Sequence, residues 1–251
     1  MDWLTSVPMA HRGLHDSQAG IIENSEDAFE AAITAGYGME CDIQISADGE
    51  AMVFHDSNLN RLTAASGPLR ERSSSEVGGL RLTGSKNTVQ TLGELVEQID
   101  GRAPLLVEIK KTEAKTGRLE ERARDLLQAY KGPAAIMSFN PQTVGWFAEN
   151  APGITRGQLS MAFKTGIGAR RPWWQRFAAR HLLINRISKP HFVGYDIKGL
   201  PVPSVAILRK LGTPILTWTV KTQHHRKIAE KHADNIIFEG FRPSLDSSAS
   251  E

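Results

Sequence analysis

The chain has 251 residues, 40% of them hydrophobic, so it can bury a large core in one α/β barrel or in two smaller domains. A formal net charge of +2 is too small to indicate nucleic-acid binding, and no DNA- or RNA-binding motif is present. The single cysteine, Cys41, excludes an intramolecular disulfide and is expected to be a small buried apolar residue. No signal peptide or membrane span is recognisable, so we expect a soluble cytoplasmic protein.

The first elements are a short strand and a helix. Residues 7–12 predict the strand, and Gly13 permits a tight exit or the close approach of a ligand. Asn24 or Ser25 is expected to cap the following helix, because acidic residues come directly after them. Gly36 is a plausible end of that helix.

A β-hairpin comes next. Two β-prone runs flank Asp-Gly at residues 48 and 49, and this pair is typical of a two-residue type I′ turn. Counting outward from that turn places Ile43 opposite Phe54 and Asp42 opposite His55.

This register predicts a polar face on the hairpin. Glu40, Asp42 and His55 share one side, while Cys41 and Phe54 share the other. An exposed polar face on a surface hairpin would explain the pattern. A functional site would explain it as well, because buried charges are costly unless they are paired or bound to a metal.

Residues 57–87 predict a long loop over one end of the fold. Thr91 opens a helix with a capping box, and residues 104–110 form a strand. Glu108 and Lys110 lie near the end of that strand and share a face, since they are two residues apart.

The rest of the chain alternates helices with strands. Helices are expected at 118–130, from 141, at 203–211 and from 222, and strands at 134–139, 155–161, 192–197, 214–220 and 235–238. Outside the return arm of the hairpin this makes eight strands, which predicts a (β/α)8 TIM barrel with a hairpin extension after the second strand. We expect one domain over residues 1–245 and a flexible tail at 246–251. An open doubly wound sheet is the alternative, but no Gly-rich phosphate fingerprint follows the first strand.

Active residues of such barrels lie at the C-terminal ends of the strands. His11, the polar face of the hairpin, Glu108 and Lys110 all fall there. We therefore expect these groups to converge at one mouth of the barrel.

An ordered set of motifs resembles the glycerophosphodiester phosphodiesterase family of TIM-barrel phosphodiesterases. Lys221 departs from the family pattern, which often has Asn there, and Gln90 replaces a common Pro. The matching motifs are His11-Arg12-Gly13, Glu23-Asn24-Ser25, Glu40-x-Asp42, Phe54-His55-Asp56, Glu108-x-Lys110, Ser138-Phe139 and Trp218-Thr219-Val220.

The resemblance implies a divalent cation held by Glu40, Asp42 and Glu108. Ligands that are all oxygen atoms suit a hard cation, Mg²⁺ or Ca²⁺. The alternative for Glu108 is a salt bridge to Lys110 or Arg12, although three converging carboxylates without a cation would repel one another.

The resemblance also implies that His11 and His55 are the general acid and base, without saying which is which. Arg12 and Lys110 would neutralise the phosphate. Trp218 would pack against the glycerol moiety or simply belong to the barrel core.

A basic, aromatic stretch at residues 166–190 stands apart from these motifs. One hypothesis is an amphipathic helix that brings residues 170–183 onto anionic lipid. The alternative is a helix that packs its aromatic side chains on the barrel and turns its arginines outward.

The resemblance therefore implies an enzyme of lipid and glycerol metabolism that hydrolyses small-molecule glycerophosphodiesters to glycerol 3-phosphate and an alcohol. Two rivals stay open. One is a lysophospholipase D-type phosphodiesterase that acts on lysophospholipids. The other is a non-catalytic barrel that binds phosphodiesters, which would have no need of two acid/base groups.

Overall fold

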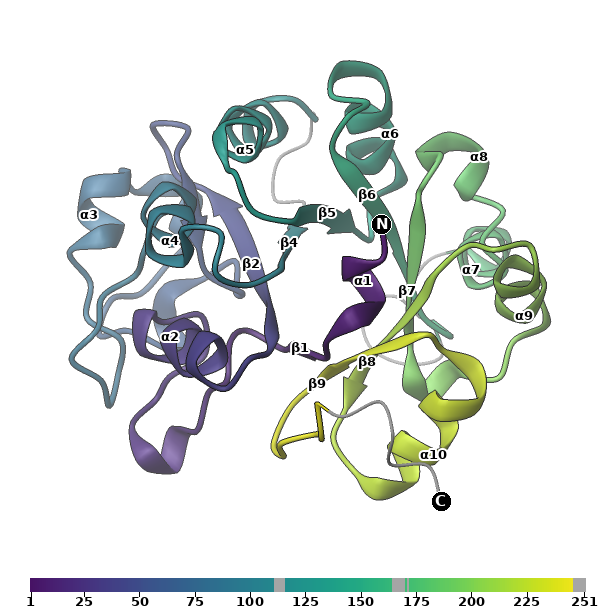
Figure 1. Cartoon of the computed structure of the whole chain (residues 1–251). Coiled ribbons are helices and arrows are strands. Elements are labelled where there is room, and N and C mark those ends of the chain that lie inside the picture. The colour runs from purple at the N-terminus through teal and green to yellow at the C-terminus, as the bar shows by residue number, and fades with distance from the viewer. Residues whose placement is uncertain (111–115, 164–169, 171, 246–251) are drawn as a thin grey trace.

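The computed structural model describes residues 1–110, 116–163, 170 and 172–245. Eight parallel strands form a closed ring, because β1 pairs with both β2 and β9 and so joins the two ends of the sheet. This confirms the predicted barrel (Figure 1). The strands of the ring are β1 (Met9–Ala10), β2 (Gly38–Ile45), β4 (Leu105–Ile109), β5 (Ala134–Ser138), β6 (Thr155–Ser160), β7 (Phe192–Asp196), β8 (Ile215–Val220) and β9 (Asn235–Phe238).

Helices surround the ring in Figure 1. The N-caps expected at Ser25, Thr91, Asn140 and Thr222 are confirmed, since each side chain accepts a hydrogen bond from the first turn of its helix. The α-helices are α1 (Trp3–Ser6), α2 (Glu26–Thr34), α3 (Ser74–Gly78), α4 (Leu92–Ile99), α5 (Arg118–Ala129), α6 (Pro141–Asn150), α7 (Trp173–Arg180), α8 (Asn185–Ser188), α9 (Pro203–Lys210) and α10 (Gln223–His232).

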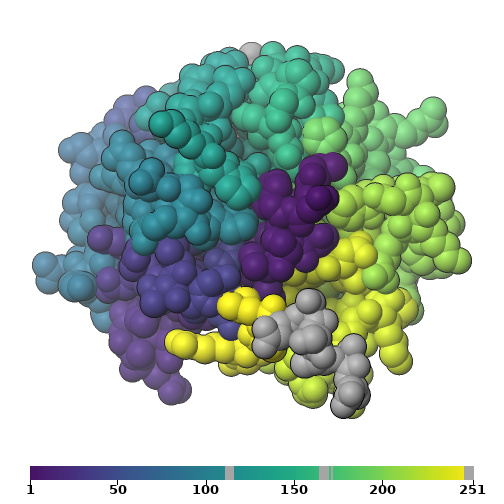
Figure 2. All heavy atoms as spheres, in the orientation of Figure 1, coloured from purple at the N-terminus to yellow at the C-terminus, as the bar shows by residue number. Residues whose placement is uncertain are grey.

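The N-terminal residues cover one end of the barrel. In Figures 1 and 2 they lie across the middle of the face that is shown. Leu4 is fully buried, in one cluster with Met9 and Phe192. The side-chain amide of Asn235 donates to the Leu4 carbonyl at 2.7 Å and to the Val7 carbonyl at 2.8 Å. These contacts lie at the starts of the strands, so the C-terminal ends of the strands lie at the opposite mouth.

The first strand is shorter than predicted. It has two residues, because Arg12 (φ 58°) and Gly13 (φ 78°) turn the chain soon after it. Gly13 thus provides the predicted tight exit from the strand. The group that approaches it closely is Ala28, since a Cβ on Gly13 would meet backbone and side-chain atoms of Ala28 at 2.8 Å. The short strand leaves part of the edge of β2 unpaired, and β3 (Ala51–Val53) occupies that edge outside the ring.

The predicted hairpin register is wrong by one residue. Ile43 lies opposite Val53, not opposite Phe54. The Ser46 hydroxyl accepts the Glu50 N–H at 2.8 Å, and the Ser46 N–H donates to the Glu50 carbonyl at 3.0 Å. These bonds close a three-residue loop with Gly49 at φ 92°, so Asp48 and Gly49 are not a two-residue turn.

In the observed register Phe54 does not share a face with Cys41, although this was expected. Its ring packs with Met52 and Leu59, whereas Cys41 is buried in the cluster between strands and helices, as predicted for a small apolar residue. His55 nevertheless lines the cavity at the mouth, directly after the last hydrogen bond between the two strands, from the Phe54 N–H to the Asp42 carbonyl at 2.9 Å.

Residues 57–87 are more ordered than a plain loop. They contain α3 and the short 3-10 segments Leu59–Arg61 and Leu69–Glu71, which cover a buried cluster that includes Val77 and Leu82. Residues 246–251, where a flexible tail is expected, lie outside the described residues. Within the described part of the chain, no helix combines the length and apolarity required to cross a bilayer.

The aromatic side chains of α7 do not pack on the barrel. Trp173, Trp174 and Phe177 are 73%, 57% and 52% exposed. The alternative in which these aromatics face the barrel is therefore wrong.

Candidate functional site

Three buried carboxylates meet at the mouth of the barrel. Glu40 and Asp42 lie two residues apart on β2, and the parallel register places Asp42 beside Glu108 of β4. One carboxylate oxygen from each of the three residues lies within 4.8 Å of the others. The structure thus brings together the three residues expected as metal ligands, on the same inward face of adjacent strands.

Two cations compensate part of this negative charge. Lys110 Nζ lies 2.7 Å from both Asp42 Oδ1 and Glu108 Oε1, and Arg12 Nε lies 3.2 Å from Asp42 Oδ2. Burial acts to raise the pKa of Asp42, but the positive charges of Lys110 and Arg12 outweigh it and hold that pKa well below its ordinary value. The salt bridge considered for Glu108 is therefore present, with Lys110 as its partner.

Glu40 is less well compensated. Its Oε2 accepts the Arg12 N–H at 2.9 Å, but its Oε1 is buried and has no hydrogen-bond partner among the described residues. Burial raises the pKa of Glu40 well above its ordinary value, and repulsion from Asp42 and Glu108 adds to this effect. An unpaired buried oxygen beside two further carboxylates fits a hard divalent cation, which takes oxygen ligands.

Each candidate histidine is paired with a carboxylate. His11 Nδ1 lies 2.9 Å from Glu239 Oε2, and His55 Nδ1 lies 2.6 Å from Asp56 Oδ1. A carboxylate accepts a hydrogen bond, so each pair assigns the proton to Nδ1 and leaves Nε2 to exchange protons. His11 Nε2 lies 4.0 Å from Glu40 Oε2, which places this histidine beside the three carboxylates.

A network of charged side chains connects His55 to Arg12, the residue next to His11. Glu23 Oε1 accepts hydrogen bonds from both Arg12 and Arg61, each at 2.7 Å. Arg61 Nε also donates to Asp56 Oδ2 at 2.6 Å. Hydrogen bonds from Arg61 and His55 hold the pKa of Asp56 at about 2 although burial opposes them, so its carboxylate stays ionised beside His55.

Two amide side chains fix the polar residues further. Asn24 Nδ2 donates to Asp42 Oδ2 at 3.0 Å, and the Asp42 N–H donates back to Asn24 Oδ1 at 3.3 Å. Gln44 Nε2 donates to the His55 carbonyl at 2.7 Å, which holds the segment that leaves the hairpin. The site is therefore positioned by side chains on β2 and on the segment before α2.

A cavity of about 240 Å³ lies among these groups. Trp218 lines it with a buried indole N–H that has no hydrogen-bond partner within the described part of the chain, and its ring meets the ring of Phe139 edge-on at 5.4 Å. One wall of the cavity is polar and consists of His11, Arg12, Glu40, His55, Glu108 and Lys110. The opposite wall is apolar except for Thr219 and consists of Met137, Phe139, Leu159, Met161, Trp218, Thr219 and Ile237.

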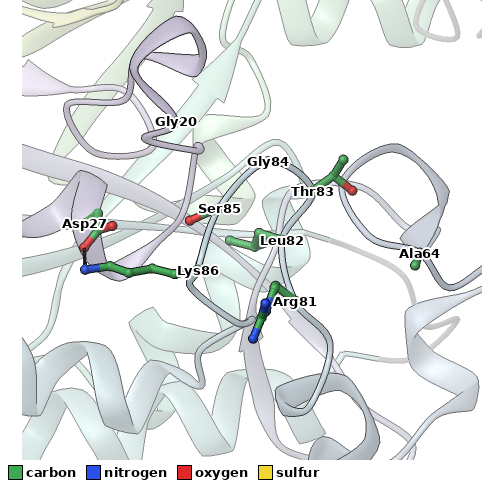
Figure 3. Close-up of a pocket in the computed structure, with 9 residues that line it drawn as sticks. All are labelled: Gly20, Asp27, Ala64, Arg81, Leu82, Thr83, Gly84, Ser85 and Lys86. Atoms are coloured by element: carbon green, nitrogen blue, oxygen red, sulfur yellow. Dashed lines mark ion pairs between the residues drawn. The ribbon is translucent and has the colours of Figure 1, made fainter.

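A groove of about 620 Å³ extends the site toward α7 and α8. It begins at Glu108 and Lys110 and reaches Trp174 and Ile187. A different hollow, of about 550 Å³, is lined by none of these residues (Figure 3). Its Lys86 approaches Asp27 at 3.7 Å, and no carboxylate or histidine of the mouth lines it.

The candidate residues from the sequence therefore come together, while Glu239 and Asp56 carried no assigned role and Asn24 was considered only as a helix cap. Asp56 and Asn24 lie inside matched motifs, next to residues that were singled out. Glu239 follows the last strand, and the alternation of side chains places it on the inward face of Ile237. That alternation is the signal by which Glu239 could have been found.

Comparisons with known proteins agree over nearly the whole chain. The model of the glycerophosphoryl diester phosphodiesterase family matches residues 11–239. The protein YhdW of Bacillus subtilis (strain 168) is 26% identical over 246 residues, which cover 91% of this chain and 92% of YhdW. A glycerophosphodiester phosphodiesterase of Caldanaerobacter subterraneus is 28% identical over 182 residues, which cover 68% of this chain and 71% of the relative.

A solved structure shares the fold. A phosphodiesterase of Oleispira antarctica, in complex with the product sn-glycerol-3-phosphate, superimposes with a TM-score of 0.76 at 22% sequence identity. The match covers 93% of each chain. The barrel and the order of its elements are therefore those of a known group of structures.

Proposed function

Because the chain belongs to the glycerophosphoryl diester phosphodiesterase family, it is a glycerophosphodiester phosphodiesterase, and we propose that it forms sn-glycerol 3-phosphate and an alcohol with the residues of the mouth described above. The observation that carries this proposal is the cluster of Glu40, Asp42 and Glu108 beside two carboxylate-paired histidines. A binding protein has no need of two histidines that are poised to exchange protons.

Glu40, Asp42 and Glu108 would hold a divalent cation, Mg²⁺ or Ca²⁺. The unpaired buried oxygen of Glu40 and the raised pKa of that carboxyl support this assignment, because a cation would remove both costs. When bound, such an ion polarises a phosphoryl oxygen and offsets developing negative charge. Arg12 and Lys110 add fixed positive charge beside it for the phosphate group.

His11 and His55 would transfer the protons. Both line the cavity, and Nδ1 of each ring is held by a carboxylate, so Nε2 is the atom that accepts or donates. One histidine would take a proton from the attacking water as its oxygen bonds to phosphorus, while the other would give a proton to the alcohol oxygen that leaves. Glu239 and Asp56 orient the rings and stabilise the imidazolium form of each.

The apolar wall would hold the glycerol moiety. Trp218 presents its ring and an unpartnered indole N–H to the cavity, which suits a hydroxyl acceptor next to carbon atoms. The cavity of about 240 Å³ is small, so it selects for a compact group on this side of the phosphate.

A lysophospholipid substrate is the second candidate. The groove that runs from Glu108 and Lys110 to Trp174 and Ile187 favours it, because a groove of mixed polar and apolar lining next to the phosphate site could take an extended substrate. Turnover of lysophosphatidylcholine compared with glycerophosphocholine separates the two. A higher kcat/KM for the lysophospholipid would identify the lysophospholipase D-type activity.

The decisive experiment measures glycerol 3-phosphate release from a panel of glycerophosphodiesters. We expect release with Mg²⁺ or Ca²⁺, loss of release with EDTA, and recovery when one of these ions is restored. Unchanged turnover in both His11→Ala and Glu40→Ala would contradict the site assignment. The exposed Glu97→Gln of α4 is the control for a harmless change of charge. A cytoplasmic location and a single domain over residues 1–245 stay predictions.

A further inference from the structure

An exposed apolar surface lies beside the mouth of the barrel. It is formed by α7, α8 and the turn between them, at the right of the barrel in Figure 1. We call it the α7–α8 surface and define it by its exposed apolar side chains, Trp173, Trp174, Phe177, Leu183 and Ile187, each more than half exposed. The other exposed large apolar side chains in the described part of the chain form no cluster of this size, since Met1 and Leu245 are single and Ile207 and Leu211 form one pair at α9. Such a concentration marks an interaction site.

The charge of this segment points to an anionic partner. Residues 164–189 contain seven Lys or Arg and no acidic residue, whereas the whole chain carries a formal net charge of only +2. No acidic residue occurs between Glu149 and Asp196. Arg170, Arg186 and Lys189 are exposed around the apolar side chains. Basic residues around tryptophan and phenylalanine are typical of a helix that lies in a lipid interface.

The α7–α8 surface is continuous with the candidate active site. The groove that starts at Glu108 and Lys110 ends at Trp174 and Ile187, which belong to this surface. A molecule that leaves a bilayer beneath α7 would therefore enter the groove that leads to the three carboxylates. A partner protein would also bury apolar area, but it would not explain a patch that is rich in arginine, lacks acidic residues and adjoins a site for phosphodiesters.

We propose that the α7–α8 surface docks the protein on membranes that contain anionic lipid, with Trp173, Phe177 and Leu183 inserted at the headgroup level and the surrounding basic residues facing the lipid phosphates. Binding to lipid depends on this surface alone, whereas delivery of a lipid-derived phosphodiester to the groove rests on the proposed function.

The test is co-sedimentation with vesicles. The variant Trp173→Ala/Phe177→Ala/Leu183→Ala removes three exposed side chains that line neither the cavity nor the groove. We expect the unchanged protein to pellet with mixed phosphatidylglycerol and phosphatidylcholine vesicles, more weakly with phosphatidylcholine alone, and less at high salt. The partition coefficient of the triple variant onto these vesicles should be at least about tenfold lower, because three apolar side chains no longer insert.

The matched control is Ile207→Ala/Leu211→Ala, which removes two exposed apolar side chains of the α9 region instead. It should pellet like the unchanged protein. Turnover of soluble glycerophosphocholine without vesicles should be unchanged in both variants, so a failure of the proposed function is seen separately from a failure to bind lipid.

Three outcomes overturn the proposal. The unchanged protein could fail to pellet with anionic vesicles, or the triple variant could pellet equally well. The third is a dimer in light scattering that the triple substitution abolishes, which would assign the surface to a second copy of the chain.

Discussion

The two walls of the cavity differ in composition and in how firmly they are held. The polar wall comes from β2, from β4 and from the residues that follow β1, β3 and β4, and ion pairs and amide hydrogen bonds hold its groups in place. The apolar wall comes mainly from β5, β6 and β8 and is held by packing, as in the edge-on contact of Phe139 with Trp218. The contrast indicates that the polar wall determines the reaction and the apolar wall determines which molecule is accepted. Substitutions on the polar wall should therefore mainly lower kcat, and substitutions on the apolar wall should mainly raise KM.

The largest effect is expected from the carboxylate cluster. Glu40→Ala should lower kcat/KM by about 10⁴-fold or more, because loss of the cation removes several kcal/mol of charge stabilisation. Isothermal titration with Mg²⁺ or Ca²⁺ should show weaker binding in the same variant. Glu97→Gln should retain both activity and ion binding, and an active Glu40→Ala enzyme would remove the cluster from the mechanism.

The histidines come next. His11→Ala and His55→Ala should each lower kcat by roughly 10²–10⁴-fold, with a smaller change in KM, because general acid–base catalysis acts in the transition state. His224→Ala, an exposed position on α10, is the control. A loss below about tenfold at either candidate would exclude that histidine as a proton-transfer group.

The paired carboxylates should have intermediate effects. Asp56→Asn should lower kcat by about 10–100-fold, as is typical for a group that orients a functional side chain. Burial places the pKa of His55 below its ordinary value, and the attraction of Asp42 and the hydrogen bond to Asp56 only partly offset it. Loss of the Asp56 charge should lower this pKa further.

The limb of the pH–rate profile that reports His55 should therefore move to lower pH in Asp56→Asn. If His55 is the base, the acidic limb moves, and if it is the acid, the alkaline limb moves. The variant thus assigns the roles that the sequence leaves open. A limb that moves to higher pH would contradict the arrangement.

Glu239→Gln removes the carboxylate charge beside His11, as Asp56→Asn does beside His55. Its effect on the stability of the fold can be measured as well. The hydrogen bond from His11 lowers the pKa of Glu239 to about 2, below its ordinary 4.5, although burial opposes it. A lowered carboxyl pKa stabilises the fold above the ordinary value and loses that contribution as pH falls through the folded value. The Tm deficit of Glu239→Gln should therefore be largest above pH 4.5 and vanish near pH 2. A Tm deficit that persists near pH 2 would show that it arises from lost packing and not from the lost charge.

The polar wall could be predicted from the sequence and the apolar wall could not. Glu40, Asp42 and Glu108 are recognisable because carboxylates in buried strands are costly unless they are paired or bound to a metal, and because they lie within family motifs. Leu159, Met161 and Ile237 give no such signal, since the same residues build any barrel core. Three residues of the apolar wall, Phe139, Trp218 and Thr219, lie in matched motifs, and only Trp218 among them was assigned a role.

The fold likewise has features that the sequence predicts and features that it does not. Caps such as Ser25 and Thr91 follow from local hydrogen bonding and were predicted. The hairpin register failed because the Ser46 side chain closes a three-residue loop, which Asp48 and Gly49 alone do not reveal. Glu239 was missed because it lies beyond the last strand, and its role depends on a contact across 228 residues of sequence.

On the apolar wall, Trp218→Phe should raise KM by about fivefold with little change in kcat. The substitution keeps the ring but removes the indole N–H, and one hydrogen bond is worth about 1 kcal/mol. A fall in kcat without a rise in KM would place Trp218 with the reacting groups instead.

The smallest effect is expected at Lys221, which stands where the family often has Asn. Lys221 Nζ contacts Glu239 Oε1 at 2.5 Å, but its side chain is half exposed, so the pair is screened by solvent. Lys221→Asn should therefore change kcat by no more than about twofold. A loss as large as that of Glu239→Gln would show that Lys221 positions the carboxylate behind His11.

The central claim is that Glu40, Asp42 and Glu108 hold one divalent cation at the mouth of the barrel. Anomalous diffraction from crystals soaked in Mn²⁺, a hard cation that stands in for Mg²⁺ or Ca²⁺, tests it most directly. We expect one strong peak within coordination distance of a carboxylate oxygen from each of the three residues. A peak elsewhere, or none with Lys110 still bridging Asp42 and Glu108, would contradict it.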